Sequence, residues 1–186
     1  MGLDMYLSAK RYAGDWNHMK DEERTAYRDV MRAVGKPGYR CEGSPSATVS
    51  VGCAYWRKAN QIHAWFVNNV QGGEDDCKTY HVEREELEKL RDLCREVIEG
   101  SKLVAGAVTT GQTLKAGVWT NETTPGKVVA NPDFAAERLP TQSGCFFGGT
   151  DYDEYYVEDL KDTVRQIDDA LGNFGEGWEF EYSSSW

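Results

Sequence analysis

The chain has 186 residues, a length that fits one domain and can bury a hydrophobic core without disulfide or metal cross-links. Hydrophobic residues make up 40% and charged residues 28%, a balance typical of globular proteins that excludes wholesale disorder. The formal net charge of -10 argues against binding of duplex nucleic acid, because contact with its phosphates needs a basic face.

The cysteines and the start of the chain point to a reducing compartment. There is no apolar run long enough to span a membrane, and the first residues, MGLDMYLSAKRY, lack the pattern of a signal peptide. We therefore expect a cytoplasmic protein with no membrane partner. The cysteines are odd in number and widely spaced, which fits neither a disulfide framework nor a zinc cluster; they are Cys41, Cys53, Cys77, Cys94 and Cys145.

The first part of the chain predicts a strand and a helix joined by a loop. Apolar and polar residues alternate over Leu3–Ser8, which is the period of a strand with one covered face. Glycine, aspartate and asparagine within Lys10–Lys20 favour a loop. Acidic residues at the start of Asp21–Val34 favour a helix N-terminus, and Gly35 followed by Pro37 stops that helix.

The stretch Tyr55–Val70, YWRKANQIHAWFVNNV, predicts a central helix that is covered on most sides. It follows a short predicted strand at Ala47–Val51. Asn60 and His63 would lie at the edge of the core. The apolar stripe of this helix would consist of Tyr55, Ala59, Ile62, Phe66 and Val70.

A long helix is also predicted over Glu83–Glu99, with Gly100 as its stop. The next region, Ser101–Gln142, is richer in glycine, threonine, alanine and valine and poorer in charge. Its segment VWTNETTPGKVV predicts either a hairpin with Thr123–Lys127 as the turn or a mobile loop. A connection this long is typical of an insertion, a lid, or an arm that reaches another subunit of a homo-oligomer.

The chain ends with a predicted helix over Glu154–Leu171 and a strand in which Trp178, Phe180 and Tyr182 alternate with polar residues. We expect this last strand to pair near the first. Together the elements predict a single α+β domain, with at least three substantial helices packed on a small, mainly antiparallel sheet. An inserted hairpin or loop region would lie around 101–142.

Familiar catalytic motifs are missing from the sequence, including Gly-rich phosphate loops, the nucleophile elbow and paired zinc histidines. A metal site can be drawn from His63, Asp75, Asp76 and Cys77. A nucleophile pair of Cys77 with His63 or His81 can also be drawn. The spacing demands neither arrangement, so we predict no catalytic residue, no metal and no cofactor.

Two stretches hold the residue types of a small-molecule site. The central helix offers an aromatic ring for stacking, a guanidinium for anions, and amide and imidazole groups for hydrogen bonds. The later stretch SGCFFGGTDYDEYY offers phenylalanines between glycines and the N-terminus of a helix, whose amides accept an anion. Together they predict a site for a small anionic, nucleotide-like ligand, formed by Trp56, Arg57, Asn60, His63, Phe146, Phe147 and Thr150.

An alternative interpretation places the same side chains in the core. Phe146 and Phe147 would fill the interior, as buried phenylalanines usually do. Asn60 and His63 would satisfy each other's hydrogen bonds. Arg57 would then pair with an acidic residue, either Asp75, Asp76 or Asp151.

Four stretches also carry a resemblance to other proteins. They are MGLDMYL at the start, YWRKANQIHAWFV in the central helix, DDC with Tyr80 after it, and LPTQSGCFFGGTDYDEYY. These stretches resemble an uncharacterised family of small proteins encoded by bacteriophages and prophages, over most of the chain except Ser101–Arg138. The resemblance implies an accessory protein in the cytoplasm of an infected host, where such proteins often interfere with host enzymes or defence systems.

Three functions from different classes follow. The first is an accessory protein that binds a small nucleotide-like anion without turnover and so sequesters a host defence signal. The second is an acidic protein that binds and inhibits a host protein, as a mimic of nucleic acid would. The third is a hydrolase or nucleotide-modifying enzyme that uses His63 with Asp76 or Cys77.

Overall fold

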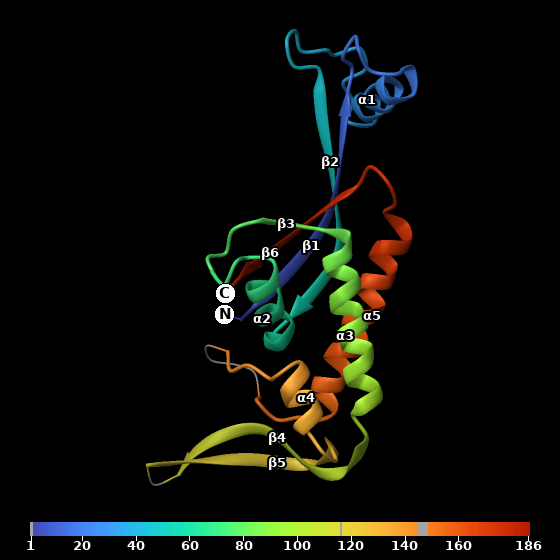
Figure 1. Ribbon diagram of the computed structural model, residues 1–186. Helices are drawn as coiled ribbons and strands as arrows, with labels where there is room; N and C mark the ends of the chain where they lie inside the picture. Colours follow the sequence, from blue (N-terminus) through green and yellow to red (C-terminus); the bar gives the residue numbers. More distant parts are fainter. Residues whose placement is uncertain (1, 116, 145–148) are drawn as a thin grey trace.

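The computed structural model describes residues 2–115, 117–144 and 149–186, and it confirms the predicted α+β class (Figure 1). No helix within these ranges is both long enough and apolar enough to cross a membrane. The elements in chain order are β1 (Asp4–Gly14), α1 (Asp21–Ala33), β2 (Ser46–Arg57), α2 (Asn60–Asn69), β3 (Tyr80–Val82), α3 (Arg84–Gly100), β4 (Leu103–Lys115), β5 (Val118–Val129), α4 (Asp133–Arg138), α5 (Glu154–Asn173) and β6 (Glu179–Ser185).

A four-stranded antiparallel sheet with the order β2-β1-β6-β3 forms the body of the protein. The predicted pairing of the last strand with the first is confirmed, with Leu7 opposite Tyr182. The alternation predicted for the first strand is confirmed as well, because Met5 and Leu7 are fully buried while Tyr6 is exposed. One face of the sheet is therefore covered.

The predicted helices α1, α3 and α5 begin and end within two residues of their expected bounds. Helices α3 and α5 lie side by side along the body (Figure 1). Arg84, at the start of α3, donates hydrogen bonds to the carbonyls of Leu171 and Phe174 at the end of α5. These bonds occupy two of the carbonyls that a helix end leaves without a partner.

Aromatic rings from three elements meet in the core. Phe66 of α2 stacks on Tyr182 of β6 with ring centroids 3.9 Å apart and an interplanar angle of 8°. Trp65 meets the edge of Phe66 at 5.4 Å, and Trp56 of β2 lies 5.9 Å from it. Each such ring buries a large apolar area, so this cluster holds α2 against the sheet.

The hairpin of β1 and β2 extends beyond the body and carries α1 at its far end (Figure 1). We call residues 12–46 the tip. The prediction of a loop over Lys10–Lys20 is wrong for its first half, because β1 continues to Gly14, which pairs with Ser46. Tyr27 of α1 is buried there, and its hydroxyl donates to the Tyr39 carbonyl at 3.2 Å.

The prediction that the central helix begins at Tyr55 is also wrong. Strand β2 extends through Arg57, and helix α2 begins at Asn60. The side chain of Gln166 on α5 hydrogen-bonds both the backbone N–H and the carbonyl of Tyr55, at 2.7 and 2.8 Å. This amide takes the place of a neighbouring strand at the edge of the sheet, and it depends on a residue 111 positions away.

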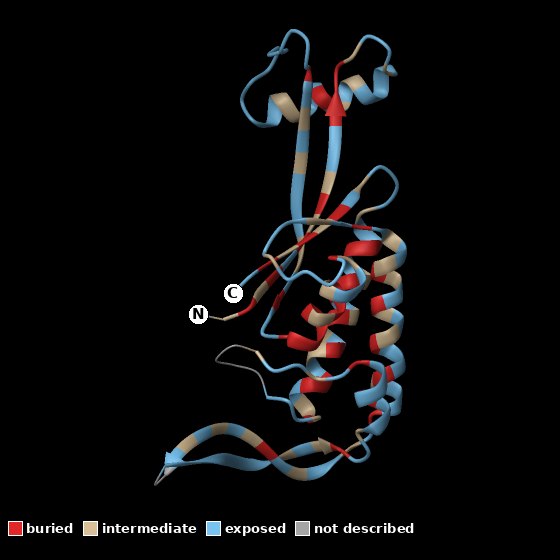
Figure 2. Cartoon of the chain, turned by 60° about the vertical axis from the view of Figure 1, so that its left-hand side comes forward, coloured by how far each residue is buried: buried red, intermediate tan, exposed pale blue. Residues whose placement is uncertain are grey.

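The region after α3 forms a hairpin arm of β4 and β5 that projects from the body, with both strands largely exposed (Figure 2). A hairpin was one of the two predicted alternatives, but the observed hairpin is longer and pairs different residues. The proposed turn at Thr123–Lys127 is wrong, because Pro125 and Gly126 pair with Ala107 and Gly106 inside the ladder. Both strands of a two-stranded sheet are edge strands, so Pro125 can occupy a position where no backbone N–H is needed.

Leucines at the centre of the body and on the arm differ in burial. Leu160 is 0% exposed in the core, whereas Leu114 on the arm is 54% exposed. We expect Leu160→Ala to lower the free energy of unfolding in urea by about 2–5 kcal/mol through cavity formation. The matched control Leu114→Ala should change it by no more than about 0.5 kcal/mol. Equal losses in both variants would contradict the assignment of the core.

Candidate functional site

A cavity of about 260 Å³, which we call the body pocket, lies where α2 begins, beside the N-terminus of α5 and the arm. Two of the predicted ligand-binding residues, Arg57 and Asn60, line it. The full lining consists of Arg57, Lys58, Asn60, Gln61, Thr109, Thr141, Gly149, Asp151, Asp153, Tyr155, Tyr156 and Asp159.

The cationic side of the body pocket is the junction of β2 and α2. Arg57 ends the strand with 64% of its side chain exposed, and its Nε lies 3.8 Å from Asp4 Oδ1. Lys58 has a φ of 62°, and its backbone N–H donates to the Leu3 carbonyl at 2.9 Å. A lysine in this left-handed region is uncommon, so the sharp turn depends on its surroundings. Arg57 and Lys58 both line the pocket from this turn.

The acidic side of the body pocket belongs to α5. Asp153 caps that helix, accepting hydrogen bonds from the backbone N–H groups of Tyr155 and Tyr156 at 2.9 and 3.1 Å. Asp159 lies further along the helix and accepts a hydrogen bond from Gln61 Nε2 at 2.9 Å. This bond joins the two sides of the pocket.

Asp159 titrates differently from an ordinary aspartate. Burial raises the pKa of its carboxyl to about 6, while the hydrogen bond from Gln61 opposes the shift. The neighbouring carboxylates of Asp162 and Asp153 raise the pKa of Asp159 a little further. At pH 7 the carboxyl of Asp159 is therefore mostly ionised, and it takes up a proton when the pH falls to about 6.

The predicted site residues do not all come together. Trp56 is 3% exposed and points into the core, opposite to Arg57, because successive side chains of a strand alternate. His63 is buried too, so the expected meeting of Trp56 and His63 with Arg57 around one ligand does not occur. Thr150 lies between the lining residues Gly149 and Asp151 in the sequence. Its carbonyl accepts a hydrogen bond from Thr141 Oγ1 at 3.0 Å.

His63 belongs to a polar cluster inside the body. Its Nδ1 lies 2.7 Å from the Tyr182 hydroxyl. Its Nε2 lies 3.0 Å from Asp75 Oδ2, within ion-pair distance, but does not form a hydrogen bond with that oxygen. Asp75 also accepts a hydrogen bond from Trp186 Nε1 at 3.1 Å. The pair expected between His63 and Asn60 is therefore replaced by contacts to residues distant in the sequence.

The acidic connection before β3 is held by its own contacts. Asp76 pairs with Lys78 at 2.5 Å and accepts from the Tyr80 hydroxyl at 3.0 Å. The expected ion pairs of Arg57 with Asp75 or Asp76 are wrong, since the carboxylate within 4 Å of Arg57 in the described part of the chain is that of Asp4. Within the described ranges no three side chains of histidine, cysteine, aspartate or glutamate are placed to hold a metal ion.

Phe146 and Phe147 lie outside the described residues, so their predicted role in a ligand site stays a prediction. Sequence reasoning missed Asp159 as a lining residue. Its signal is weak, because it is one polar position among several acids on α5, next to the buried Leu160. Only the packing of α2 on α5 brings Gln61 to it.

The raised pKa of Asp159 predicts a pH dependence of stability. Between about pH 4 and pH 6 the folded chain keeps a proton on Asp159 that the unfolded chain has lost, so the contribution of this residue falls as the pH rises. We expect Asp159→Asn to gain about 1–3 kcal/mol in unfolding free energy over the wild type between pH 4 and pH 7. Urea unfolding of both proteins across this range measures the difference.

A control reverses the sign. The hydrogen bond from Arg91 lowers the pKa of Asp92, so the stability that this residue contributes is present above its ordinary pKa of 3.8 and is lost only below it. Asp92→Asn should therefore be less stable than the wild type by an amount that stays nearly constant from pH 4 to pH 7. Curves for wild type and Asp159→Asn that stay parallel from pH 4 to pH 7 would contradict the assignment of Asp159.

Comparisons with protein-family models, with curated proteins and with solved structures find no match to this chain. The resemblance to bacteriophage and prophage proteins therefore stays a prediction from the sequence.

Proposed function

We propose that the protein binds a small nucleotide-like anion in the body pocket, without turnover. The observation that carries this proposal is a lining that combines two cations, Arg57 and Lys58 at the junction of β2 and α2, with the carboxylate of Asp159 on α5. A guanidinium and an ammonium suit an anionic group such as a phosphate. Carboxylates suit hydroxyl and amino donors, as on a ribose or a base.

The remaining lining residues fit the rest of such a ligand. Amide side chains such as Asn60 carry both donors and acceptors, which match the edge of a base. Tyr155 is 62% exposed at the pocket and offers a ring for stacking. The volume of about 260 Å³ is at the small end for ligand sites, so a mononucleotide suits it better than a larger molecule.

The charge of the lining limits the ligand. Arg57 and Lys58 face three carboxylates, those of Asp151, Asp153 and Asp159. A triphosphate would bring several negative charges beside these groups, and like charges repel strongly where water is scarce. A ligand with one anionic group avoids this repulsion.

Binding without turnover rests on the kinds of residue present. The described lining contains cations, carboxylates, amides, threonines and tyrosines, and no histidine, cysteine or serine. An enzyme would have to use Asp159 as a general base, since its pKa of about 6 suits that role. In an infected bacterium, as the family resemblance implies, binding alone would sequester a host defence signal.

Isothermal titration with nucleoside monophosphates and cyclic mononucleotides tests this proposal. We expect one of these ligands to bind, and Arg57→Gln to weaken its binding about tenfold or more, because a charge-assisted hydrogen bond is lost. The control Arg95→Gln removes the same charge from α3, where 44% of the side chain is exposed, and should leave the affinity unchanged.

Mass spectrometry of the ligand recovered after denaturation completes the experiment. An unchanged mass supports binding without turnover, whereas a changed mass would assign the pocket to an enzyme. Absence of binding by every mononucleotide would overturn the proposal.

The arm favours a second candidate function, the binding of a host protein. Its far end carries three exposed apolar side chains, with Leu114 paired across the strands to Trp119, and Val118 next to them. Trp119 and Val118 are each 65% exposed. Exposed tryptophan is a frequent anchor of protein interfaces. The acidic chain would add electrostatic attraction to a basic partner.

Affinity capture from host lysate, at low and at high salt, tests this second function. We expect Trp119→Ala to lose a partner that the wild type retains, because the anchor is removed. Trp186→Ala is the matched control, since Trp186 is 59% exposed and lies outside the arm, directly after β6. Capture of the same proteins by both variants would exclude the arm as the binding surface. A change of mass in solution with Trp119→Ala would show instead that the arm joins copies of the chain.

A further inference from the structure

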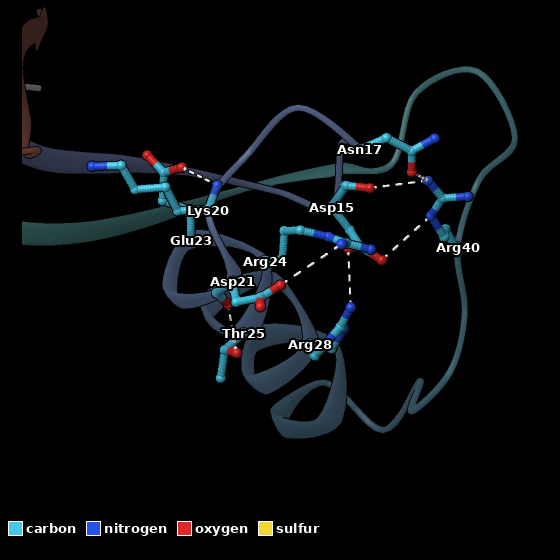
Figure 3. A network of polar contacts seen from close by, with 9 residues as sticks. All are labelled: Asp15, Asn17, Lys20, Asp21, Glu23, Arg24, Thr25, Arg28 and Arg40. Atoms are coloured by element: carbon cyan, nitrogen blue, oxygen red, sulfur yellow. Dashed lines mark hydrogen bonds and ion pairs between the residues drawn. The ribbon is translucent and has the colours of Figure 1, made fainter.

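Three arginines of the tip converge on one buried carboxylate (Figure 3). Asp15 is 6% exposed and accepts a hydrogen bond from Arg24 Nε at 2.6 Å. Arg28 Nη2 lies 3.3 Å from the same oxygen, and Arg40 Nε lies 3.3 Å from the other. Arg40 also donates to the Asp15 carbonyl at 3.0 Å. Asp15 thus serves three guanidinium groups at once.

The positive charge at this point exceeds the negative charge. Arg24 has a second carboxylate, Asp21, at 3.8 Å. For Arg28 and Arg40, Asp15 is the single carboxylate within 4 Å in the described part of the chain. The hydrogen bond from Arg24 lowers the pKa of Asp15, so that carboxylate stays ionised and still leaves an excess of cations.

A second cavity, the tip pocket, opens beside this cluster with a volume of about 330 Å³. Its charged lining consists of Arg28, Arg32 and Arg40 with Asp15. Arg28 and Arg40 keep 51% and 45% of their side chains exposed, so both can reach a ligand. Tyr27, Met31, Pro37 and Tyr39 supply an apolar wall.

A purely structural role explains only part of this arrangement. Arg24, at 2.6 Å, already provides Asp15 with a short charge-assisted hydrogen bond. Arg28 and Arg40 add longer contacts at 3.3 Å, and each guanidinium carries five donors, more than these contacts use. The chain has 31 acidic and 21 basic residues, yet the lining of this pocket holds three arginines and one aspartate. Arg32 pairs with Asp29 at 2.6 Å, so Arg28 and Arg40 carry the excess charge. Both guanidinium groups belong to residues that line the cavity.

We propose that the tip pocket binds a phosphate-type oxyanion with two or more negative charges, held by Arg28 and Arg40. The planar guanidinium matches two oxygens of such an anion at once. The source is either a free polyphosphate or the phosphate of a small organic molecule, whose remainder would contact Tyr39 and Met31. This site is separate from the body pocket and has the opposite balance of charge.

Isothermal titration of the full chain with pyrophosphate, inorganic phosphate and AMP tests the tip pocket. We expect pyrophosphate to bind and Arg28→Gln to weaken its binding about tenfold, while Arg28→Lys keeps part of the affinity. Arg95→Gln removes the same charge elsewhere and should have no effect. In the Arg57→Gln variant, whose body pocket is weakened, tighter binding of AMP than of pyrophosphate would identify an organic ligand as the source, and the reverse order would identify a polyphosphate.

The body pocket is tested separately in the same titrations. Arg57→Gln should leave the affinity for pyrophosphate unchanged, so a failure of one site does not imply a failure of the other. Side-chain NMR of the wild type adds a measurement that needs no variant. The Nε–H signals of Arg28 and Arg40 should shift on addition of pyrophosphate, and that of Arg95 should not. No saturable binding of any of the three probes, or equal affinities of Arg28→Gln and Arg95→Gln, would overturn the proposal.

Discussion

The stack of Tyr182 on Phe66 is the contact on which the body depends, since it joins the last strand to a helix near the middle of the chain. Strand β6 lies between β1 and β3, so the same strand also connects the start of the chain to the segment after α2. The Tyr182 hydroxyl also lies 2.7 Å from His63 Nδ1, so the same buried side chain makes a polar contact with α2 as well. The sheet cannot form from neighbouring segments alone and must gather residues from both ends of the chain.

Strand β2 links the two pockets. Its first residue, Ser46, closes the tip beside Gly14, and its last residue, Arg57, lines the body pocket. The strand period then separates Trp56 from Arg57, placing one ring in the core and one cation at the surface. In a helix through the same residues the two side chains would lie about 100° apart around the axis and not on opposite faces. Arg57 lines the body pocket and Trp56 does not, because β2 continues to Arg57 before the chain turns into α2.

Charge is distributed unevenly over an acidic protein. At the tip, three arginines lie within 4 Å of the one carboxylate of Asp15, whereas three carboxylates, those of Asp151, Asp153 and Asp159, line the body pocket. The tip pocket, with more cations than carboxylates, and the body pocket, with both kinds of charge, favour different ligands, because electrostatic complementarity governs specificity more than raw affinity. The net charge of -10 describes neither pocket.

Local patterns in the sequence determined the helices α1, α3 and α5, the alternation of the first and last strands, and the α+β class, because each depends on residues within a few turns or pleats of one another. Tertiary structure alone decided that Tyr55 belongs to a strand, through Gln166, and that His63 faces Tyr182 and Asp75. It also decided that Pro125 pairs with Ala107 inside the ladder of the arm and does not form its turn. These outcomes depend on partners far away in the chain, which no periodicity within one segment contains.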